Sequence, residues 1–294
     1  MAQAEVFSPA KINLFLAVTG KRNDGFHSLL SVVAQLDFGD RLKIDISEGK
    51  REVSMTCSDS NLPTGEGNLV YRAAALYLDR FDLERKVVID LDKVIPIGAG
   101  LGGGSSNAAV VLRALNDELS CCDSDTLSNL AAEIGSDCPL FLNSKPLIMS
   151  GRGEILDDLP QAVLKSLRGR QVFVFKPNFS ISTPWAYGQL AKGGCHYFDA
   201  EVAADRLKSY LDSDGVDLEG LLYNSFEEPI FAKIVGLRVL RDLIDEQFGL
   251  RMLMSGSGSS CFVLCDLEQV DGLRKLVTDC FGEEAFARAS SIID

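Results

Sequence analysis

The chain has 294 residues, 46% of them hydrophobic, and a formal net charge of −13, which suits about two globular domains and argues against a nucleic-acid-binding surface. No apolar run approaches the roughly 18 residues that span a bilayer. Since the N-terminal segment lacks a secretory signal, we expect a cytoplasmic protein whose eight cysteines are free thiols.

The first part of the chain predicts an antiparallel sheet and a helix. Hydrophobic alternation predicts three strands, over 5–18, 29–36 and 40–47. The first is interrupted at Ser8–Pro9, where proline favours an edge or a bulge, and a turn at 23–25 follows it. After a polar loop, Asn68 is a suitable N-cap for a helix over 69–81.

The most informative stretch is PIGAGLGGGSSN at 96–107, which stands between a strand-like segment at 87–96 and a helix-like one at 108–119. Glycines let a backbone approach an anion closely, and free amides at a helix N-terminus attract it. The loop therefore predicts a polyphosphate site, with its two serines or Asn107 capping the helix or binding a phosphate or its Mg²⁺. It fits neither a Walker A loop nor a dinucleotide fingerprint.

The second half predicts a further α+β region. A helix over 124–134, with Ser124 as its cap, precedes a loop and a strand. The composition then changes near 155–170, so we predict two α+β domains, 1–158 and 159–294. Later strands are expected at 171–177 and on both sides of a small-residue turn, and later helices at 201–211, near 234–243 and at 267–281. That turn, Ser255–Ser260, either lets the backbone approach a ligand or is a tight hairpin turn.

Five side chains are candidates for chemistry. Asp137 can accept a proton during phosphoryl transfer, although a turn aspartate is the more common role. Lys11 can hold such a carboxylate ionised or neutralise a phosphoryl group, against the alternative of a solvated lysine. His27 can donate a hydrogen bond, act as a base or cap its turn. Phe26 and Tyr187 suit stacking on a flat ring or packing in the core.

These pieces together resemble the GHMP kinases over nearly the whole chain. The segment at 96–109 is similar to the family's ATP loop, and SGSGSSCFVL at 255–264 to its third motif. More specifically, PAKINLFL and DGFHSL within 8–40 resemble the opening of members that act on a cytidine diphosphate-linked methylerythritol. GSDCPLFL at 135–142 resembles the catalytic segment of those members, and ISTPWAY at 181–187 their cytidine-side segment.

The resemblance implies a two-domain α+β GHMP kinase fold. Residues 1–158 would be an ATP-binding domain like ribosomal protein S5 domain 2, and 159–294 a ferredoxin-like α+β domain. The implied activity is phosphorylation of the substrate's 2-hydroxyl with ATP and Mg²⁺, in the non-mevalonate route to isoprenoid precursors. The implied partner is this small-molecule substrate, with no nucleic acid, membrane or obligatory protein partner.

The resemblance also implies roles for individual residues. Asp137 would be the general base, with Lys11 orienting it and stabilising charge. The ATP phosphates would be cradled by Pro96, Ile97, Gly98, Ala99, Gly100, Leu101, Gly102, Gly103, Gly104, Ser105 and Ser106. Lys93 and Asn68 would lie near the nucleoside. The cytosine ring would be sandwiched by Phe26 and Tyr187, and the substrate hydrogen-bonded by Asn13 and His27. No metal ligand is assigned.

Three other functions stay open at this point. Another GHMP kinase would act on a different alcohol and would not require the cytidyl group. A nucleotide sensor would bind ATP without turnover, although the presence of both Lys11 and Asp137 argues against it. A regulatory interaction protein would use the glycine loops to contact a partner, for which the sequence offers no positive signal.

Overall fold

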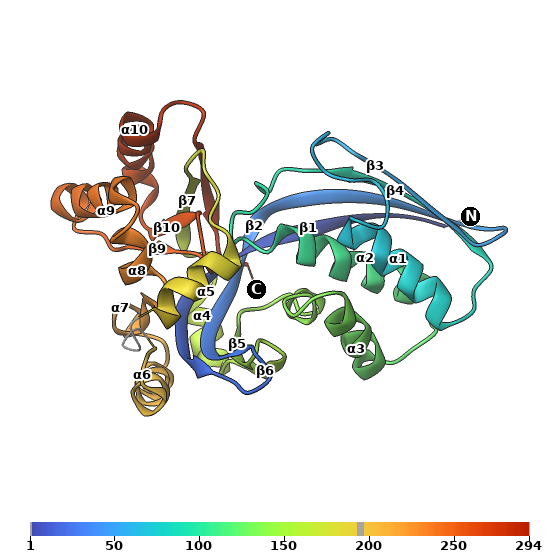
Figure 1. Ribbon diagram of the computed structural model, residues 1–294, viewed down its shortest axis with the longest axis horizontal. Helices are drawn as coiled ribbons and strands as arrows, with labels where there is room; N and C mark the ends of the chain where they lie inside the picture. The colour runs from blue at the N-terminus through green and yellow to red at the C-terminus, as the bar shows by residue number, and fades with distance from the viewer. Residues whose placement is uncertain (1, 193–196, 294) are drawn as a thin grey trace. The chain divides into compact units, whose positions relative to one another are not determined.

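The computed structural model describes residues 2–192 and 197–293 (Figure 1). Contacts divide the chain into two compact units that alternate along the sequence. Unit 1 comprises Met1–Ala10, Phe38–Ile97 and Gly102–Ser144, and unit 2 comprises Lys11–Asp37, Gly98–Leu101 and Lys145–Asp294. The domains 1–158 and 159–294 stay a prediction, because the compact units are interleaved and neither of them is continuous.

Two long strands contribute residues to both units: β1 (Ala2–Lys21) and β2 (His27–Glu48). The sequence predicted a break in the second of them between 36 and 40, and this prediction is wrong. Gly39 continues the strand because it packs directly on the backbone of β1, where a Cβ would lie only 2.1 Å from the Ser8 carbonyl oxygen. The polar residue that follows, Asp40, is fully buried and has its own hydrogen-bond partners.

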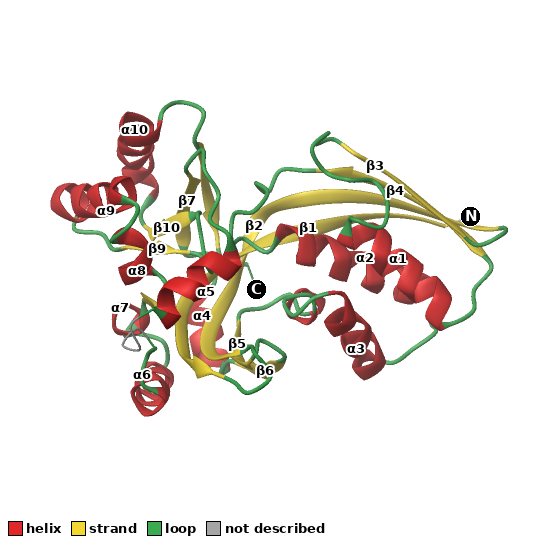
Figure 2. Ribbon diagram, in the orientation of Figure 1, coloured by secondary structure: helices red, strands yellow, loops and turns green. Residues whose placement is uncertain are grey.

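Unit 1 is a sheet with helices on one face (Figure 2). Its further elements are β3 (Glu52–Cys57), α1 (Leu69–Arg80), β4 (Arg85–Asp92), α2 (Gly103–Leu119), α3 (Ser124–Ile134) and the short 3-10 helix η1 (Pro139–Leu142). The strand order is β3-β4-β2-β1, with β3 parallel to β4 and β4 antiparallel to β2. Helices α1 and α2 pack against each other, and α3 packs on both.

The core of unit 1 lies between this sheet and its helices. Strand β4 buries Val87, Ile89 and Leu91 and exposes the residues between them, as a strand with one covered face does. The helices meet these side chains with buried residues such as Tyr77, Val111 and Leu115. Each buried aliphatic side chain stabilises the fold by about 1.5–3 kcal/mol by leaving water. This packing holds α2 in place on the sheet.

The helix starts of unit 1 confirm one predicted cap and correct two. Asn68 caps α1, as expected, and accepts a hydrogen bond from the Val70 amide at 3.0 Å. Helix α2 begins earlier than expected, and its N-cap is Gly102 in the left-handed conformation, without a side-chain cap. The two serines and Asn107 therefore lie inside the helix and do not cap it. Helix α3 is capped by Asp123 and not by Ser124.

Unit 2 contains the remaining strands and helices. Strand β5 (Leu147–Gly151) pairs with residues 29–33 of β2 and with β6 (Ile155–Asp158), and β8 (Tyr223–Asn224) pairs with Phe15 and Leu16 of β1. The helices of the middle part are α4 (Gln161–Leu167), α5 (Thr183–Ala191), α6 (Ala200–Asp212), α7 (Leu218–Leu221) and α8 (Glu227–Phe231). The helix predicted at 201–211 corresponds to α6.

The C-terminal part of unit 2 has a ferredoxin-like arrangement. Its elements in chain order are β7 (Gln171–Lys176), α9 (Val235–Phe248), β9 (Met252–Met254), β10 (Cys261–Leu264), η2 (Leu267–Gln269), α10 (Val270–Phe281) and β11 (Phe286–Ser291). The antiparallel sheet has the order β11-β7-β10-β9, which is that of a β-α-β-β-α-β fold. The sequence predicted all of these major elements except β11, whose alanines and serines lack a strand-like alternation.

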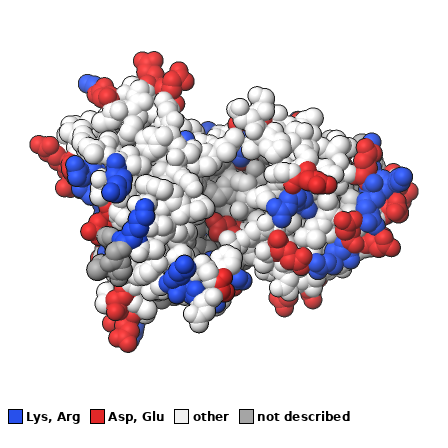
Figure 3. All heavy atoms as spheres, in the orientation of Figure 1, with Lys and Arg blue, Asp and Glu red and all other residues white. Residues whose placement is uncertain are grey.

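The surface and the cysteines complete the description. Within residues 2–192 and 197–293, none of the helices combines the length and the apolar character that a membrane span requires. Seven cysteines of this part of the chain are free thiols, whereas Cys195 lies outside the described residues. On the face that Figure 3 shows, acidic and basic side chains lie interspersed.

Candidate active site

The glycines of the predicted phosphate loop adopt the conformations that only glycine adopts without strain. Gly98, Gly100 and Gly102 have φ angles of 61°, 76° and 73°, all in the left-handed region. Between them, the side chains of Ala99 and Leu101 are buried. The loop therefore alternates buried anchors with left-handed turns, a backbone pattern typical of anion-binding nests.

The N-terminus of α2 carries the unpaired amides that the sequence predicted. The first helical hydrogen bond joins the Ser106 amide to the Gly102 carbonyl oxygen at 2.9 Å. The amides of Gly103, Gly104 and Ser105 precede this bond, so the helix itself gives them no acceptor. Together with the positive end of the helix dipole, they form a site suited to a phosphate group.

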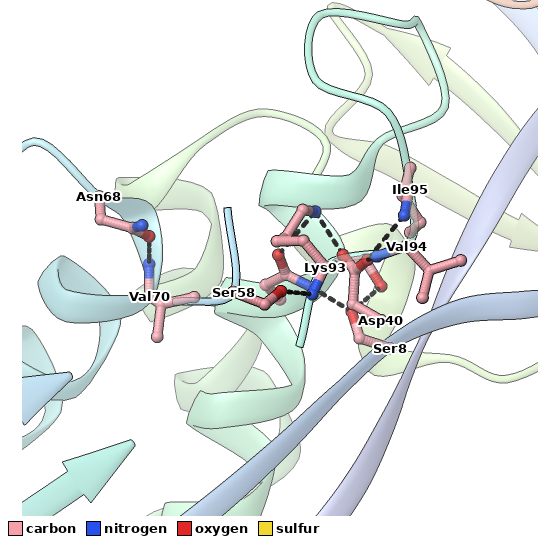
Figure 4. Close-up of polar contacts among 10 residues, drawn as sticks. Ser8, Asp40, Ser58, Asn68, Val70, Lys93, Val94 and Ile95 are labelled. Atoms are coloured by element: carbon pink, nitrogen blue, oxygen red, sulfur yellow. Dashed lines mark hydrogen bonds and ion pairs between the residues drawn. The ribbon is translucent and has the colours of Figure 1, made fainter. Parts of the chain in front are cut away.

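Asp40 lies at the centre of a buried polar cluster in unit 1 (Figure 4). One of its carboxylate oxygens accepts hydrogen bonds from the amides of Val94 at 2.7 Å and Ile95 at 2.8 Å. The other accepts from the ammonium group of Lys93 and, at 2.8 Å, from Asn107 Nδ2. Asp40 is fully buried, and these four donors compensate the cost of burying its charge.

Lys93 and Asn68, which the sequence predicted near the nucleoside, both have partners within unit 1 (Figure 4). The Lys93 side chain is 7% exposed and paired with Asp40, and its amide donates to Ser58 Oγ at 2.8 Å. The Asn68 side chain is occupied in capping α1. A contact of either residue with a nucleotide stays a prediction.

The two serines at the end of the loop differ in what they can offer a ligand. Ser106 is fully buried, and its hydroxyl accepts a hydrogen bond from Ser8 Oγ at 2.7 Å. Ser105 is half-buried and is hydrogen-bonded to the thiol of Cys138. Burial raises the pKa of this thiol to about 11, although the bond to Ser105 lowers it. The thiol is therefore protonated at neutral pH and serves as a packing group.

Asp137 lies in the turn between α3 and η1, next to Cys138. Because Cys138 contacts Ser105, this turn packs at the N-terminus of α2, and η1 packs along the same helix. The Asp137 side chain is half-buried. Unit 1 thus packs the turn that contains Asp137 against the start of α2.

In unit 2, Lys11 and Asn13 form a second buried pair. Lys11 Nζ donates to Asn13 Oδ1 at 2.5 Å, and Asn13 Nδ2 donates to Ser31 Oγ at 2.9 Å. The Gly256 amide also donates to Asn13 Oδ1, at 3.0 Å. The side chain of Asn13 is 1% exposed, so its main visible role is to orient Lys11. Substrate binding by Asn13 stays a prediction.

The loop at 255–260 supports this pair. The sequence had left open whether this loop approaches a ligand or is only a tight hairpin turn. Asn224 Nδ2 donates to the carbonyl oxygens of Met254 at 2.5 Å and Gly256 at 2.9 Å. Ser255 Oγ donates to the Gly100 carbonyl at 3.0 Å. A Cβ on Gly100 would lie 2.2 Å from the Ser255 carbonyl oxygen, so glycine is required for this close approach.

The aromatic residues predicted to hold the cytosine lie in unit 2. The rings of His27 and Tyr187 stack with centroids 4.5 Å apart, and the Tyr197 hydroxyl lies 3.2 Å from His27 Nε2. Phe26 is 54% exposed, and the Arg152 guanidinium lies 4.9 Å from its ring centroid. Since His27 covers one face of Tyr187, the sandwich between Phe26 and Tyr187 stays a prediction.

The protonation state of His27 follows from its surroundings. Burial, with a contribution from the charge of Lys21, lowers the pKa of His27 below its ordinary value. The imidazole is therefore neutral at neutral pH and offers one donor and one acceptor. This suits a group that recognises a ring by hydrogen bonds.

Sequence reasoning missed the residues that hold the others in place. Asp40, Ser8 and Asn224 orient loops or side chains of the site. Ser8 and Asp40 stand at the two ends of the segment 8–40 that carries the resemblance, but neither was given a role, and Asn224 lies outside every motif. A signal existed for Asp40, because an acidic residue between Phe38–Gly39 and an alternating strand is unusual unless its carboxylate has partners. No comparable signal marks Asn224.

Comparisons with known proteins agree with this arrangement. Residues 68–145 match the family model described as GHMP kinases N terminal domain. The chain is 38% identical to the 4-diphosphocytidyl-2-C-methyl-D-erythritol kinase of Methylacidiphilum infernorum, over 89% of this chain and 86% of that protein. It is 41% identical to the protein of the same name from Synechococcus sp. (strain CC9311), over 90% and 87% of the two chains.

Solved structures agree as well. The crystal structure of 4-(cytidine 5'-diphospho)-2C-methyl-D-erythritol kinase is 32% identical, covers 98% of this chain and 99% of its own, and has a TM-score of 0.78. Homoserine kinase from Cytophaga hutchinsonii, 19% identical with a TM-score of 0.76 over 99% and 95% of the two chains, shares the fold.

The chain is therefore a GHMP kinase, one of a group of ATP-dependent enzymes, and the predicted α+β GHMP kinase fold is confirmed. Within this group it belongs to the family of 4-diphosphocytidyl-2-C-methyl-D-erythritol kinases, whose members it matches over most of its length.

Proposed function

We propose that the chain transfers the γ-phosphoryl group of ATP to the 2-hydroxyl of 4-diphosphocytidyl-2-C-methyl-D-erythritol, a step in isoprenoid precursor synthesis. The observation that carries this proposal is that the turn containing Asp137 packs on the first turn of α2 through Cys138 and Ser105, where the helix has free amides suited to phosphate. The names of the relatives supply the substrate class. The cytoplasm, as the compartment, stays a prediction from the sequence.

Asp137 acts as the general base in this proposal. A carboxylate that accepts the hydroxyl proton as the new bond forms contributes to phosphoryl transfer mainly when it is well positioned. Its half-buried turn, packed on α2 through Cys138 and Ser105, supports such a fixed position. Lys11 orients the hydroxyl and stabilises developing charge, and its own orientation is supported by Asn13.

The chain holds ATP through the loop 96–106. The amides of Gly103, Gly104 and Ser105 bind phosphate oxygens, and the hydroxyl of Ser105 is the side-chain donor of this set. ATP itself supplies the phosphoryl group. Mg²⁺ is the expected counterion. Among the described residues, no group of three or more His, Cys, Asp or Glu side chains could hold a metal ion, so phosphates and water would supply most of its ligands.

The substrate's cytidyl group is recognised in unit 2. We assign the stacking contacts to Phe26 and Tyr187 and the hydrogen bonds to His27, as the resemblance implies. The neutral imidazole of His27, stacked on Tyr187, supports this assignment. A substrate without the cytidyl group loses these contacts, so the chain should not phosphorylate methylerythritol phosphate.

The substrate is tested by incubating the protein with ATP, Mg²⁺ and either 4-diphosphocytidyl-2-C-methyl-D-erythritol or methylerythritol phosphate. We expect ADP release and one added phosphate, measured by product mass, with the cytidyl compound alone. Turnover of methylerythritol phosphate at an equal rate would show that the substrate class is wrong.

The base is tested by Asp137→Asn, which removes the proton acceptor and keeps the shape of the side chain. We expect turnover to fall by about 10²-fold or more while the affinity for ATP stays within about twofold. Asp125→Asn, in the exposed first turn of α3, is the matched control and should keep full activity. Wild-type turnover by Asp137→Asn would exclude Asp137 as the base.

A further inference from the structure

We propose that Asp40, which no part of the predicted site contains, is a positioning residue that fixes both ends of the phosphate-binding loop and thereby sets the affinity for ATP. The inference rests on the proposed use of this loop for ATP. It concerns a residue of β2 that lies outside the loop and is inaccessible to a ligand, since Asp40 is fully buried.

The donors to Asp40 come from both sides of the loop. Lys93, Val94 and Ile95 follow the end of β4 and lead into the loop. Asn107 belongs to the first turns of α2, directly after the loop. One carboxylate therefore joins the residues that enter the loop to those that leave it, and all of these contacts lie within unit 1 (Figure 4).

The chemistry of the cluster requires an acceptor with a full charge. The amides of Val94 and Ile95 lie beyond the last paired residue of β4, Asp92, so Asp40 takes the place of a strand partner that these buried donors need. The same group neutralises Lys93, which would otherwise be an unpaired buried charge. An asparagine in place of Asp40 would turn an N–H group toward either the Lys93 ammonium group or the backbone amides, all of which are themselves donors.

The cluster also reaches the residues that present amides to the phosphate. Asn107 Nδ2 donates to Ser8 Oγ at 2.8 Å, and Ser8 in turn donates to Ser106 Oγ. A Cβ on Gly103 would lie 3.2 Å from Lys93 Nζ, so the paired lysine packs directly on the helix start. The middle of the loop is held by Ser255 and by the Lys11 amide, which donates to the Leu101 carbonyl oxygen at 2.9 Å. The contacts of Asp40 complete this support at the two ends, where the amides of the helix start must be held in one arrangement.

The test is the variant Asp40→Asn, assayed for ATP affinity by equilibrium titration and for KM and kcat. We expect the dissociation constant and the KM for ATP to rise about tenfold or more, as for loss of a hydrogen bond to a charged group. The KM for the cytidyl substrate should stay within about twofold. This split separates positioning of the ATP loop from a general loss of folded protein.

The matched control is Val87→Ala, a truncation in the same sheet at a buried position outside the loop. It should lower the melting temperature without raising the KM for ATP. If Asp40→Asn does not fold, the double variant Asp40→Asn/Lys93→Met, which removes the unpaired ammonium, takes its place. An ATP dissociation constant within twofold of the wild type, in Asp40→Asn or in the double variant that replaces it, would overturn the proposal.

The failure of this inference is distinguishable from failure of the proposed function. Titration with ATP alone needs neither the second substrate nor turnover. If the wild type binds ATP but does not phosphorylate the cytidyl compound, the substrate assignment fails, and the effect of Asp40→Asn on ATP affinity still decides the role of Asp40.

Discussion

The two glycine-rich loops of this kinase are supported by different chemistry. The ends of the first, at 93–95 and 102–107, are held in unit 1 by the buried ionised groups of Asp40 and Lys93. The loop at 255–260 is held in unit 2 by neutral groups, chiefly the amide of Asn224 and close backbone packing. We expect the first to present amides to an anion, whereas the second contacts the pair Lys11–Asn13 through the Gly256 amide.

This difference shows how an acidic protein can bind a polyphosphate. With a net charge of −13, the chain cannot rely on an overall positive field. Lys93, the lysine beside the first loop, is neutralised by Asp40, so the attraction for phosphate there comes from helix amides and the dipole of α2. The positive charge expected to act on the substrate is that of Lys11, in the other unit, whose ammonium group donates to Asn13.

The largest expected effect on stability is that of Asp40→Ala. The variant leaves the Lys93 ammonium buried without its partner, and removal of one member of a buried pair typically costs about 3–5 kcal/mol. We expect the free energy of unfolding, measured in urea, to fall by about this amount. Replacing both members, in Asp40→Ala/Lys93→Met, should recover part of it. A double variant no more stable than the single one would argue against the ion pair as the source of the effect.

A smaller effect is expected for Asn224→Ala. The carbonyl oxygens of Met254 and Gly256 lose a neutral donor, which costs about 1–3 kcal/mol for buried groups. Because Gly256 contacts Asn13, turnover should fall. The ATP dissociation constant should rise less than in Asp40→Asn, since the second loop reaches the first only through neighbours such as Ser255, which contacts Gly100. The control is Asn61→Ala, at an exposed position where the side-chain amide donates to Asp59 Oδ1. A loss of ATP affinity in Asn224→Ala as large as that in Asp40→Asn would remove the distinction between the loops.

A third effect should be seen only as a change with pH. Burial raises the pKa of Glu227, which accepts a hydrogen bond from the Met254 amide beside the second loop, to about 7. The folded state thus binds this proton more tightly than the unfolded chain, and its stabilising contribution is present below about pH 4.5 and lost as the pH rises through 7.

Glu227→Gln mimics the protonated form at every pH. Its melting temperature should match that of the wild type near pH 4 and exceed it at pH 8. Glu228→Gln, at an exposed neighbouring position, is the control and should follow the wild type throughout. Parallel curves for Glu227→Gln and the wild type would show that Glu227 does not titrate in this range.

Local patterns predicted much of this fold. The cap at Asn68, the alternation of β4 and the small-residue turn at 255–260 are set by nearby residues, and each was read correctly from the sequence. The continuity of β2 through residues 37–40 was not predicted, because it depends on close packing against Ser8, which is far away in the chain. Strand β11 was missed for a similar reason: its pairing with β7 defines it, and its own residues carry little strand preference.

The candidate site shows the same limit. Motifs indicated the phosphate loop, Asp137 and Lys11, since each of these lies in a recognisable segment. The partners that orient them, Asp40 and Asn224, are single polar residues whose role appears only when distant segments come together. Ser106 also differs from what its motif suggests. The motif implies a phosphate contact, but the Ser106 hydroxyl is buried against Ser8, which only the tertiary structure brings near.

The interleaving of the two units has a consequence for how the chain is made on the ribosome. Unit 1 has all of its residues once position 144 has emerged, but residues 11–37 belong to unit 2. Asp37 binds Ser290 and Ser291, which follow it by 253 and 254 residues in the chain. At about 5–20 residues per second, this early segment waits on the order of 10 to 50 s for those partners, so unit 1 can fold long before unit 2 is completed.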